Sequence, residues 1–156
     1  MATMQVYLNF PGTTQEALTF YQSVFGGEFL ELIRFGDTPE AGRVAAHEQD
    51  KIMHMALRTD HGMLLMATDA LESMGHRLTQ GNNFHLSLTT ETREEADQLF
   101  QGLAPGGTVS LPMQEMNWGD YFGMLTDKFG VQWMVSYPMP QAQPQAQPEK
   151  AAEASA

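Results

Sequence analysis

The chain contains two similar stretches, TTQEALTFYQSV at residues 13–24 and TREEADQLFQGL at residues 92–103. Each opens with Thr-x-x-Glu, the capping box, in which a hydroxyl and a carboxylate accept hydrogen bonds from the first free amides of a helix. Each continues with apolar residues at i, i+3, i+4 and i+7, which is one stripe of an amphipathic helix. A Gly pair follows each copy, at residues 26–27 and 106–107, and suits a helix end and a turn. We therefore predict two equivalent helices. Their expected buried stripes are Ala17, Phe20, Tyr21 and Val24 in the first, and Ala96, Leu99, Phe100 and Leu103 in the second.

The segments around the two helices also correspond. Before the helices, residues 4–10 and residues 84–89 alternate apolar and polar side chains, which is typical of half-buried strands. Three further strand-like segments follow each helix. They are residues 28–35, 52–59 and 63–67 in the first half, and 108–115, 121–126 and 131–137 in the second. The order strand–helix–strand–strand–strand thus occurs twice, and it predicts an α+β fold of two βαβββ modules.

The repeat defines one domain over residues 1–137, with module one at about residues 4–68 and module two at about residues 82–137. After it the composition changes to Pro, Gln and Ala. Residues 138–156 have no apolar stripe whose burial could offset the entropy of ordering them. We predict that this segment is a disordered tail.

Composition excludes several classes of function. The chain has no Cys, which rules out disulfides and thiolate catalysis. Its 19 acidic and 8 basic residues give a net charge of −11, and such a surface repels nucleic-acid backbones. No window approaches the ~18 apolar residues of a membrane span, and the first residues lack the basic and apolar leader of an exported protein. We expect a cytoplasmic protein that binds neither nucleic acid nor membrane.

One helix can cover only one face of a four-stranded sheet, so the second face of each module needs a partner. A small twisted sheet curls into half a cup, and two copies make a whole cup, within one chain or across a dimer. A concave site between paired modules suits a small molecule.

Four further stretches carry a family resemblance: YLNFPG at residues 7–12, LMATD at 65–69, WGDYFG at 118–123 and DKFGVQW at 127–133. Together with the repeat they resemble the PhnB-like branch of the vicinal oxygen chelate superfamily, which also holds glyoxalase I, extradiol dioxygenases and bleomycin-resistance proteins. The resemblance covers about residues 4–137. It implies a glyoxalase-like fold with a curved mixed sheet, and a homodimer, because relatives pair their modules across chains. PhnB-like members share no settled reaction, so the resemblance leaves open whether the protein is an enzyme.

Metal-using members of that superfamily bind a divalent cation through the first and last strands of each module, and the cation chelates two adjacent substrate oxygens. The matching positions here carry Gln5 and Met66 in module one, and His85 and Met134 in module two. Thioether sulfur suits copper(I) and not magnesium, nickel, zinc or iron(II). We therefore expect no metal cofactor, with His85 as a weak candidate ligand should a divalent metal bind.

The cup is expected to be apolar and adaptable, because the chain has 12 Met and such side chains fit varied ligands. The predicted lining comprises Gln5, Tyr7, His54, Met66, His85, Trp118, Tyr121 and Met134. Core packing of the Met residues, and a structural role for His85, are the alternatives. Two functions remain open: a homodimeric small-molecule-binding protein, and a metal-dependent lyase, isomerase or dioxygenase that uses His85.

Overall fold

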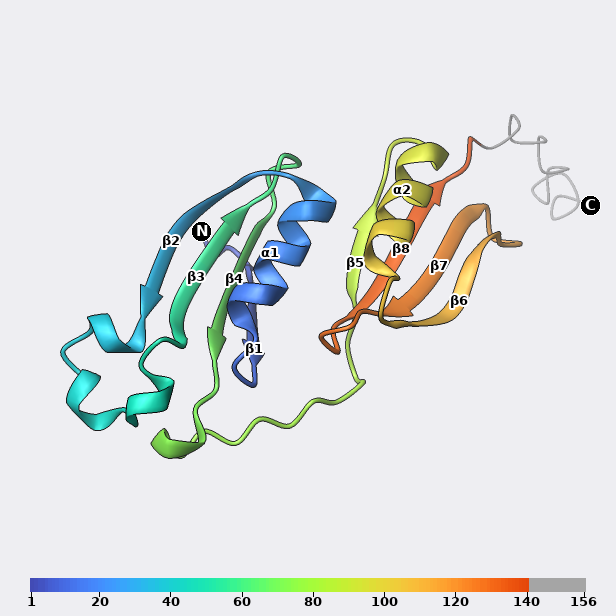
Figure 1. The fold of residues 1–156 in the computed structure, drawn as a ribbon. Helices are drawn as coiled ribbons and strands as arrows, with labels where there is room; N and C mark the ends of the chain where they lie inside the picture. The colour runs from blue at the N-terminus through green and yellow to red at the C-terminus, as the bar shows by residue number, and fades with distance from the viewer. Residues whose placement is uncertain (141–156) are drawn as a thin grey trace, which may run out of the picture.

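The computed structural model describes residues 1–140, and these form two four-stranded sheets, each with one α-helix (Figure 1). The first module contains β1 (Val6–Phe10), α1 (Thr14–Phe25), β2 (Glu28–Arg34), β3 (Ile52–Arg58) and β4 (Leu64–Asp69). The second contains β5 (Leu86–Thr89), α2 (Arg93–Leu103), β6 (Thr108–Glu115), β7 (Asp120–Thr126) and β8 (Gln132–Pro138). The predicted α+β fold of two βαβββ modules is confirmed. Short 3-10 helices occur at Phe35–Asp37, Ala41–Arg43, Ala46–Glu48 and Glu72–Met74.

The C-terminal boundary differs slightly from the prediction. Strand β8 includes Pro138, and the backbone N–H of Met139 donates to the carbonyl of Gly119. The predicted tail beyond residue 140 lies outside the described residues. Within residues 1–140, no helix is long and apolar enough to cross a membrane.

Both sheets have the same topology. Their strand orders are β1-β4-β3-β2 and β5-β8-β7-β6. The first strand of each module runs parallel to the last one, and the remaining neighbours are antiparallel. Figure 1 shows the sheets side by side, with α1 and α2 lying on the same side of the molecule. Each sheet therefore has one helix-covered face and one open face.

The repeat extends to strand register and burial. Tyr7 pairs with Met66 in the first sheet, and Ser87 pairs with Met134 in the second. Residues 1–10 and 81–90 show the same sequence of exposed, intermediate and buried positions. The predicted equivalence of Met66 with Met134, and of Leu8 with Leu88, is confirmed.

A matching pair of Gly residues sets the start of the second strand in each module. A Cβ atom on Gly27 would overlap the backbone oxygen of Arg58, and one on Gly107 would overlap the backbone oxygen of Thr126. Only a residue without a Cβ atom lets the chain pass this close to the neighbouring strand. The two Gly pairs thus serve as strand starts as well as helix ends.

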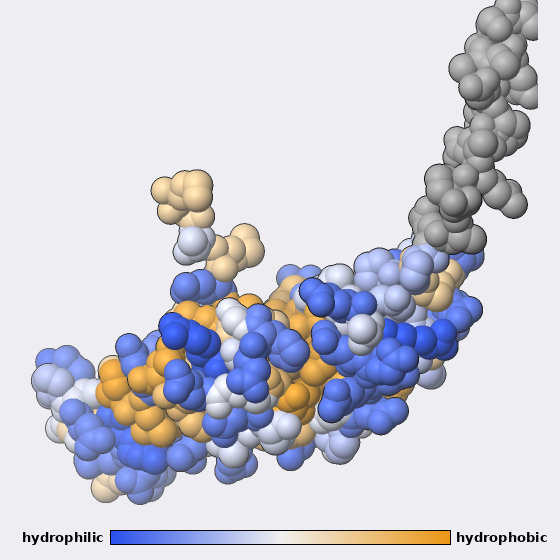
Figure 2. Space-filling view, turned by 90° about the horizontal axis from the view of Figure 1, so that it is seen from above, coloured by the Kyte–Doolittle hydropathy of each residue, from blue (hydrophilic) through white to orange (hydrophobic). Residues whose placement is uncertain are grey.

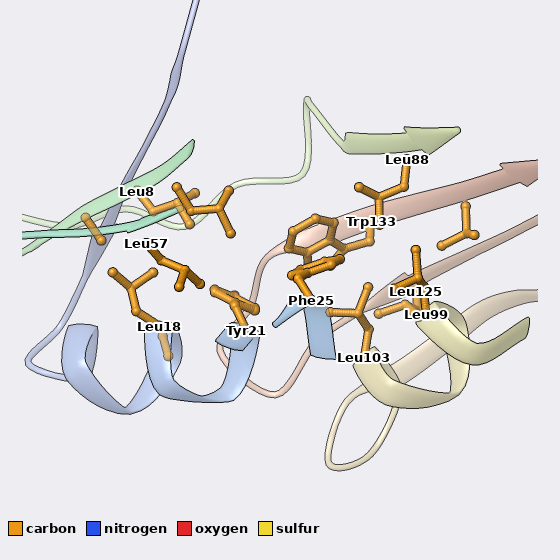
Figure 3. Packing of buried hydrophobic residues seen from close by; sticks show 14 of the residues in the cluster. Leu8, Leu18, Tyr21, Phe25, Leu57, Leu88, Leu99, Leu103, Leu125 and Trp133 are labelled. Atoms are coloured by element: carbon orange, nitrogen blue, oxygen red, sulfur yellow. The ribbon is translucent and has the colours of Figure 1, made fainter. Parts of the chain in front are cut away.

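The modules share one hydrophobic core. The ring of Trp133 from β8 lies 5.6 Å from that of Tyr21 and 5.5 Å from that of Phe25, both on α1, measured between centroids (Figure 3). Buried aromatic pairs of this kind stabilise beyond the burial of their area. The Tyr21 hydroxyl and the Trp133 indole N–H both donate to Asp127, at 2.6 and 2.8 Å. The first helix is thereby anchored to the second module.

This shared core changes the buried stripe of α1. The stripe of α2 is buried as predicted, but in α1 Leu18 and Phe25 are buried and Phe20 and Val24 are only partly covered. The prediction was wrong at these positions, because α1 packs against the second module as well as its own sheet. Val24, for example, faces Gly102 of α2.

The two helix caps also differ. The Thr92 hydroxyl accepts a hydrogen bond from the backbone N–H of Glu95 at 3.1 Å, which is the N-cap bond of the predicted capping box. Thr13 makes no such bond. In the first module the buried carboxylate of Asp69 caps instead and accepts from the N–H of Thr14 at 2.9 Å. The capping box predicted at residues 13–16 was therefore wrong: the acceptor is Asp69 in place of Thr13, and the donor is the N–H of Thr14 in place of that of Glu16.

Candidate functional site

The open face of the first sheet carries two of the polar side chains predicted for the site, Tyr7 and His54. Strand alternation directs Leu8, Leu65 and Ala67 toward α1, where all three are buried. The intervening residues face away from the helix. Register then places Tyr7 beside Met66 on neighbouring strands, and His54 beside Ile33.

A chain of hydrogen bonds crosses this open face from β1 to β2. The Tyr7 hydroxyl lies 3.1 Å from Nδ1 of His54, and Nε2 of His54 lies 3.1 Å from a carboxylate oxygen of Glu31. In a neutral imidazole one nitrogen donates and the other accepts. The carboxylate at Nε2 favours the proton there, so Nδ1 accepts from Tyr7. The two rings also stack, with centroids 5.8 Å apart.

The environment of these groups ranges from half-buried to exposed. The His54 side chain is 21% accessible and that of Glu31 is 58% accessible. Partial burial raises the pKa of Tyr7 above its ordinary value, so the phenol is neutral at physiological pH. The three hydrogen-bonded residues therefore offer a neutral phenol, an oriented imidazole and a carboxylate on one surface. Such groups can bind the polar end of a ligand and exchange protons with it.

Gln5 and His85 meet elsewhere, in the seam between the modules. They line a cavity of about 490 Å³ together with Met63 from the β3–β4 turn and Trp133 from β8. A second cavity of about 210 Å³ lies between β1 and residues 78–84 and is lined partly by Tyr7. Gln5 and His85 thus line one cavity, apart from His54.

The residues at the four metal positions do not suit the divalent cations used by metal-dependent relatives. Met66 and Met134 hold the equivalent places on the open faces and offer only thioether sulfur. Within residues 1–140 no three His, Asp or Glu side chains gather in a metal-binding group. Glu31, one of the carboxylates of the first open face, already lies 3.1 Å from Nε2 of His54. Two thioethers, an amide and one imidazole are therefore a poor donor set for the divalent cations that metal-dependent relatives use.

The open face of the second sheet is more apolar. Phe122 occupies the place on β7 that His54 holds on β3, and Ser87 takes the place of Tyr7. Trp118 packs edge-on against Phe122, with centroids 6.0 Å apart, and stays 56% exposed. Its indole N–H donates to Asp120 at 3.1 Å. The indole is thus available as a wall on this face.

Tyr121 was predicted on the wrong face. It is only 7% exposed and lies on the helix side, where its hydroxyl donates to Asp97 of α2 at 2.6 Å. The guanidinium of Arg93 covers its ring at 4.0 Å. Alternation along β7 explains the error, because Phe122 and Tyr121 must point to opposite faces.

The predicted lining is therefore divided among several places. Tyr7, His54 and Met66 share the first open face, Trp118 and Met134 belong to the second module, and Gln5 and His85 line the seam. Glu31 was missed by the sequence interpretation. Glu31 stands between Leu30 and Leu32 of an edge strand, and its role can be recognised only once the pairing of that strand with β3 is known.

Two βαβββ modules with parallel outer pairs, helices on one face and open sheets on the other define a protein of the glyoxalase-like fold. The chain belongs to the Glyoxalase/Bleomycin resistance protein/Dioxygenase superfamily, whose family model matches residues 7–135. The predicted resemblance to this superfamily is confirmed.

The comparisons also confirm the PhnB-like branch. The chain is 34% identical over 138 residues to the protein YjdN of Escherichia coli. The matched region covers 83% of this chain and 91% of YjdN. The crystal structure of protein PA1353 from Pseudomonas aeruginosa is similar at a TM-score of 0.74 and 34% identity, covering 88% of this chain and 100% of that one. The PhnB protein from Bacillus cereus gives a TM-score of 0.71 at 28% identity, covering 87% and 99%.

Proposed function

We propose that this protein binds a small organic molecule on its open sheet faces, in an apolar site lined by Met and aromatic side chains and without a metal. The observation that supports this most is the Tyr7–His54–Glu31 chain beside Met66. It supplies an oriented polar group next to apolar surface, which is the usual composition of a ligand site. The ligand is expected to be flat and largely apolar, with one hydroxyl or carbonyl group for Tyr7 and His54.

The site is completed by a second copy of the chain, so that the protein is a homodimer. Each sheet leaves one face open, and large apolar side chains remain exposed on the single chain. Figure 2 shows areas of apolar surface on one side of the molecule. The most exposed of these side chains outside the N-terminal arm are Tyr7, Leu30, Leu32, Phe84, Val109 and Trp118. Light scattering of the full chain at micromolar concentration is expected to give the mass of a dimer, and a monomer would contradict this part of the proposal.

Ligand binding is tested by titrating the protein with 1-naphthol and following the fluorescence of Trp118 and Trp133. We expect saturable quenching by the parent protein. Tyr7→Phe and His54→Gln should each lose about 1–3 kcal/mol of binding free energy, because each removes a hydrogen bond to the ligand or to the adjacent residue of the Tyr7–His54–Glu31 chain. The matched control is His47→Gln, since the His47 side chain is 82% exposed and lies outside the chain of hydrogen bonds. Equal affinity in all three variants would contradict the site.

The alternative function is a metal-dependent lyase, isomerase or dioxygenase built on His85. It is favoured by one observation, the placement of His85 with Gln5 in the seam cavity. Elemental analysis of protein purified without chelator separates the two functions. About one divalent metal per chain, lost in His85→Ala, would replace the binding proposal with the enzymatic one.

A further inference from the structure

A separate cavity of about 730 Å³ lies outside the open faces and the seam. Its walls come from the exposed side of α1, the segment before β3 and the turn between β7 and β8. Neither Tyr7, His54 nor His85 lines it. Both modules contribute to its walls, so a ligand held there would touch both.

Cations gather in this cavity. Arg34, Lys51 and Lys128 all line it, although the whole chain has only 8 Lys and Arg residues and a net charge of −11. None of the three forms an ion pair within 4 Å of a carboxylate among residues 1–140. Elsewhere on so acidic a surface an anion is repelled, so a fixed group of cations marks a specific place for one.

Neutral groups hold two of these cations in position. Arg34 donates to the backbone oxygen of Asp50 at 2.7 Å and to the side-chain oxygen of Gln15 at 3.2 Å. Lys51 donates to the backbone oxygen of Gly12 at 3.1 Å. These hydrogen bonds orient the charged groups without neutralising them. The guanidinium of Arg34 and the ammonium of Lys51 each keep further N–H donors that can bind a ligand.

Three carboxylates, those of Glu16, Asp50 and Asp69, also line the cavity, and they differ in burial and in hydrogen bonding. Asp69 is buried, and its two oxygens accept hydrogen bonds from the N–H groups of Thr14 and Ile52 at 2.9 and 2.8 Å. Glu16, Asp50 and Lys128 are exposed, whereas Arg34 and Lys51 are half-buried. Water and salt screen exposed charges more than half-buried ones. Because the Asp69 carboxylate is met by two backbone N–H groups, Arg34 and Lys51 are the half-buried charged groups of the cavity that keep N–H donors for an anion.

Phe20 and Phe129 supply an apolar wall. Their rings lie 5.8 Å apart, and the Lys128 ammonium lies 4.6 Å from the Phe20 centroid and 5.4 Å from that of Phe129. Phe20 is only partly covered by Phe129 of the second module, so part of its ring lines the cavity. Flat apolar groups bind such a wall, and the ammonium above it keeps a positive charge beside them.

We infer that this cavity binds a small organic anion, a phosphate monoester with a flat apolar group, whose phosphate is held by Arg34, Lys51 and Lys128 and whose apolar part packs on Phe20 and Phe129. Charge-assisted hydrogen bonds to Arg and Lys are the usual means of holding phosphate. The site is independent of the ligand site on the open faces.

Calorimetric titration of the full chain with phenyl phosphate at about 0.15 M salt tests the inference. We expect saturable binding that weakens at least about tenfold in Lys51→Gln and in Lys128→Gln, because each loses a charge-assisted contact. Lys128 makes no hydrogen bond to the rest of residues 1–140, so its replacement spares the fold. Arg43→Gln is the matched control, since Arg43 lies outside the cavity and pairs with Glu40. Its affinity should stay within about twofold of the parent.

Three results would overturn the inference. The first is the absence of saturable binding up to about 10 mM phenyl phosphate. The second is equal weakening in Arg43→Gln, which would indicate attraction by overall charge. The third is binding of inorganic phosphate as tight as that of phenyl phosphate, which would remove the role of the aromatic wall. Tyr7→Phe should leave the titration unchanged, so a failure here is distinguishable from failure of the open-face site.

Discussion

At the scale of single residues, Asp127 does the most to join the two halves. One carboxylate oxygen accepts from the N–H groups of Phe129 and Val131, and the other accepts from Tyr21 and Trp133. A buried carboxylate is tolerated when donors satisfy both of its oxygens. Its neighbourhood also raises the pKa of Tyr21, chiefly through burial of the phenol and further through the negative charge of Asp127.

The raised pKa of Tyr21 predicts a loss of stability in alkaline solution. The folded state favours the neutral phenol, so its contribution is complete below the unfolded pKa near 10. Above that pH the unfolded chain ionises first, and stability falls by about 1.4 kcal/mol per pH unit. Urea unfolding of the parent and of Tyr21→Phe at about pH 8 and pH 11 measures this. The decline should be smaller in the variant by about that amount, and equal declines in both proteins would contradict the assignment.

At the scale of elements, the two helices show how far a sequence pattern predicts a fold. The Thr-x-x-Glu pattern located both helix starts correctly, because the local spacing is that of a helix in either module. The pattern could not distinguish the caps, since Asp69 reaches Thr14 from 55 positions further along the chain. Likewise alternation fixed two faces for β7, but only the assembled sheet shows that Tyr121 lies on the helix side.

The difference in caps predicts a difference in stability. Thr92→Ala removes an observed hydrogen bond to the helix start and is expected to cost about 1 kcal/mol of unfolding free energy. Thr13→Ala removes no such bond and should cost less than about 0.5 kcal/mol. Urea unfolding monitored by circular dichroism measures both, with Thr92→Ser as the variant that keeps the hydroxyl. Equal costs at Thr13 and Thr92 would mean that the caps are equivalent.

At the scale of the whole molecule, two duplicated modules fold around one core. The repeat predicted two modules, and the comparisons confirm the superfamily, but the contact between α1 and Trp133 has no local signature in the sequence. The same holds for the candidate site. Strand alternation predicted the face of Tyr7, and the family resemblance pointed to His54 and Met66, whereas the link to Glu31 depends on which strands are neighbours.

The shared core predicts that the modules unfold together. In a Trp118→Phe background, Trp133 fluorescence reports on the junction, while far-ultraviolet circular dichroism reports on both modules. Because Trp133 contacts Tyr21 and Phe25 of the first module, we expect the two urea transitions to coincide. Two separate transitions, with Trp133 released before the bulk of the secondary structure, would show that each module is stable alone.

Equivalent positions in the two sheets carry different side chains, and this difference affects how a ligand would be oriented. Tyr7 and His54 in one sheet correspond to Ser87 and Phe122 in the other. A molecule that spans an open face of the first module and an open face of the second meets hydrogen-bonding groups at one end and an apolar aromatic surface at the other. In the reverse orientation its polar group would lie against Phe122 without a hydrogen-bonding partner, so the proposed ligand is expected to bind in a single orientation.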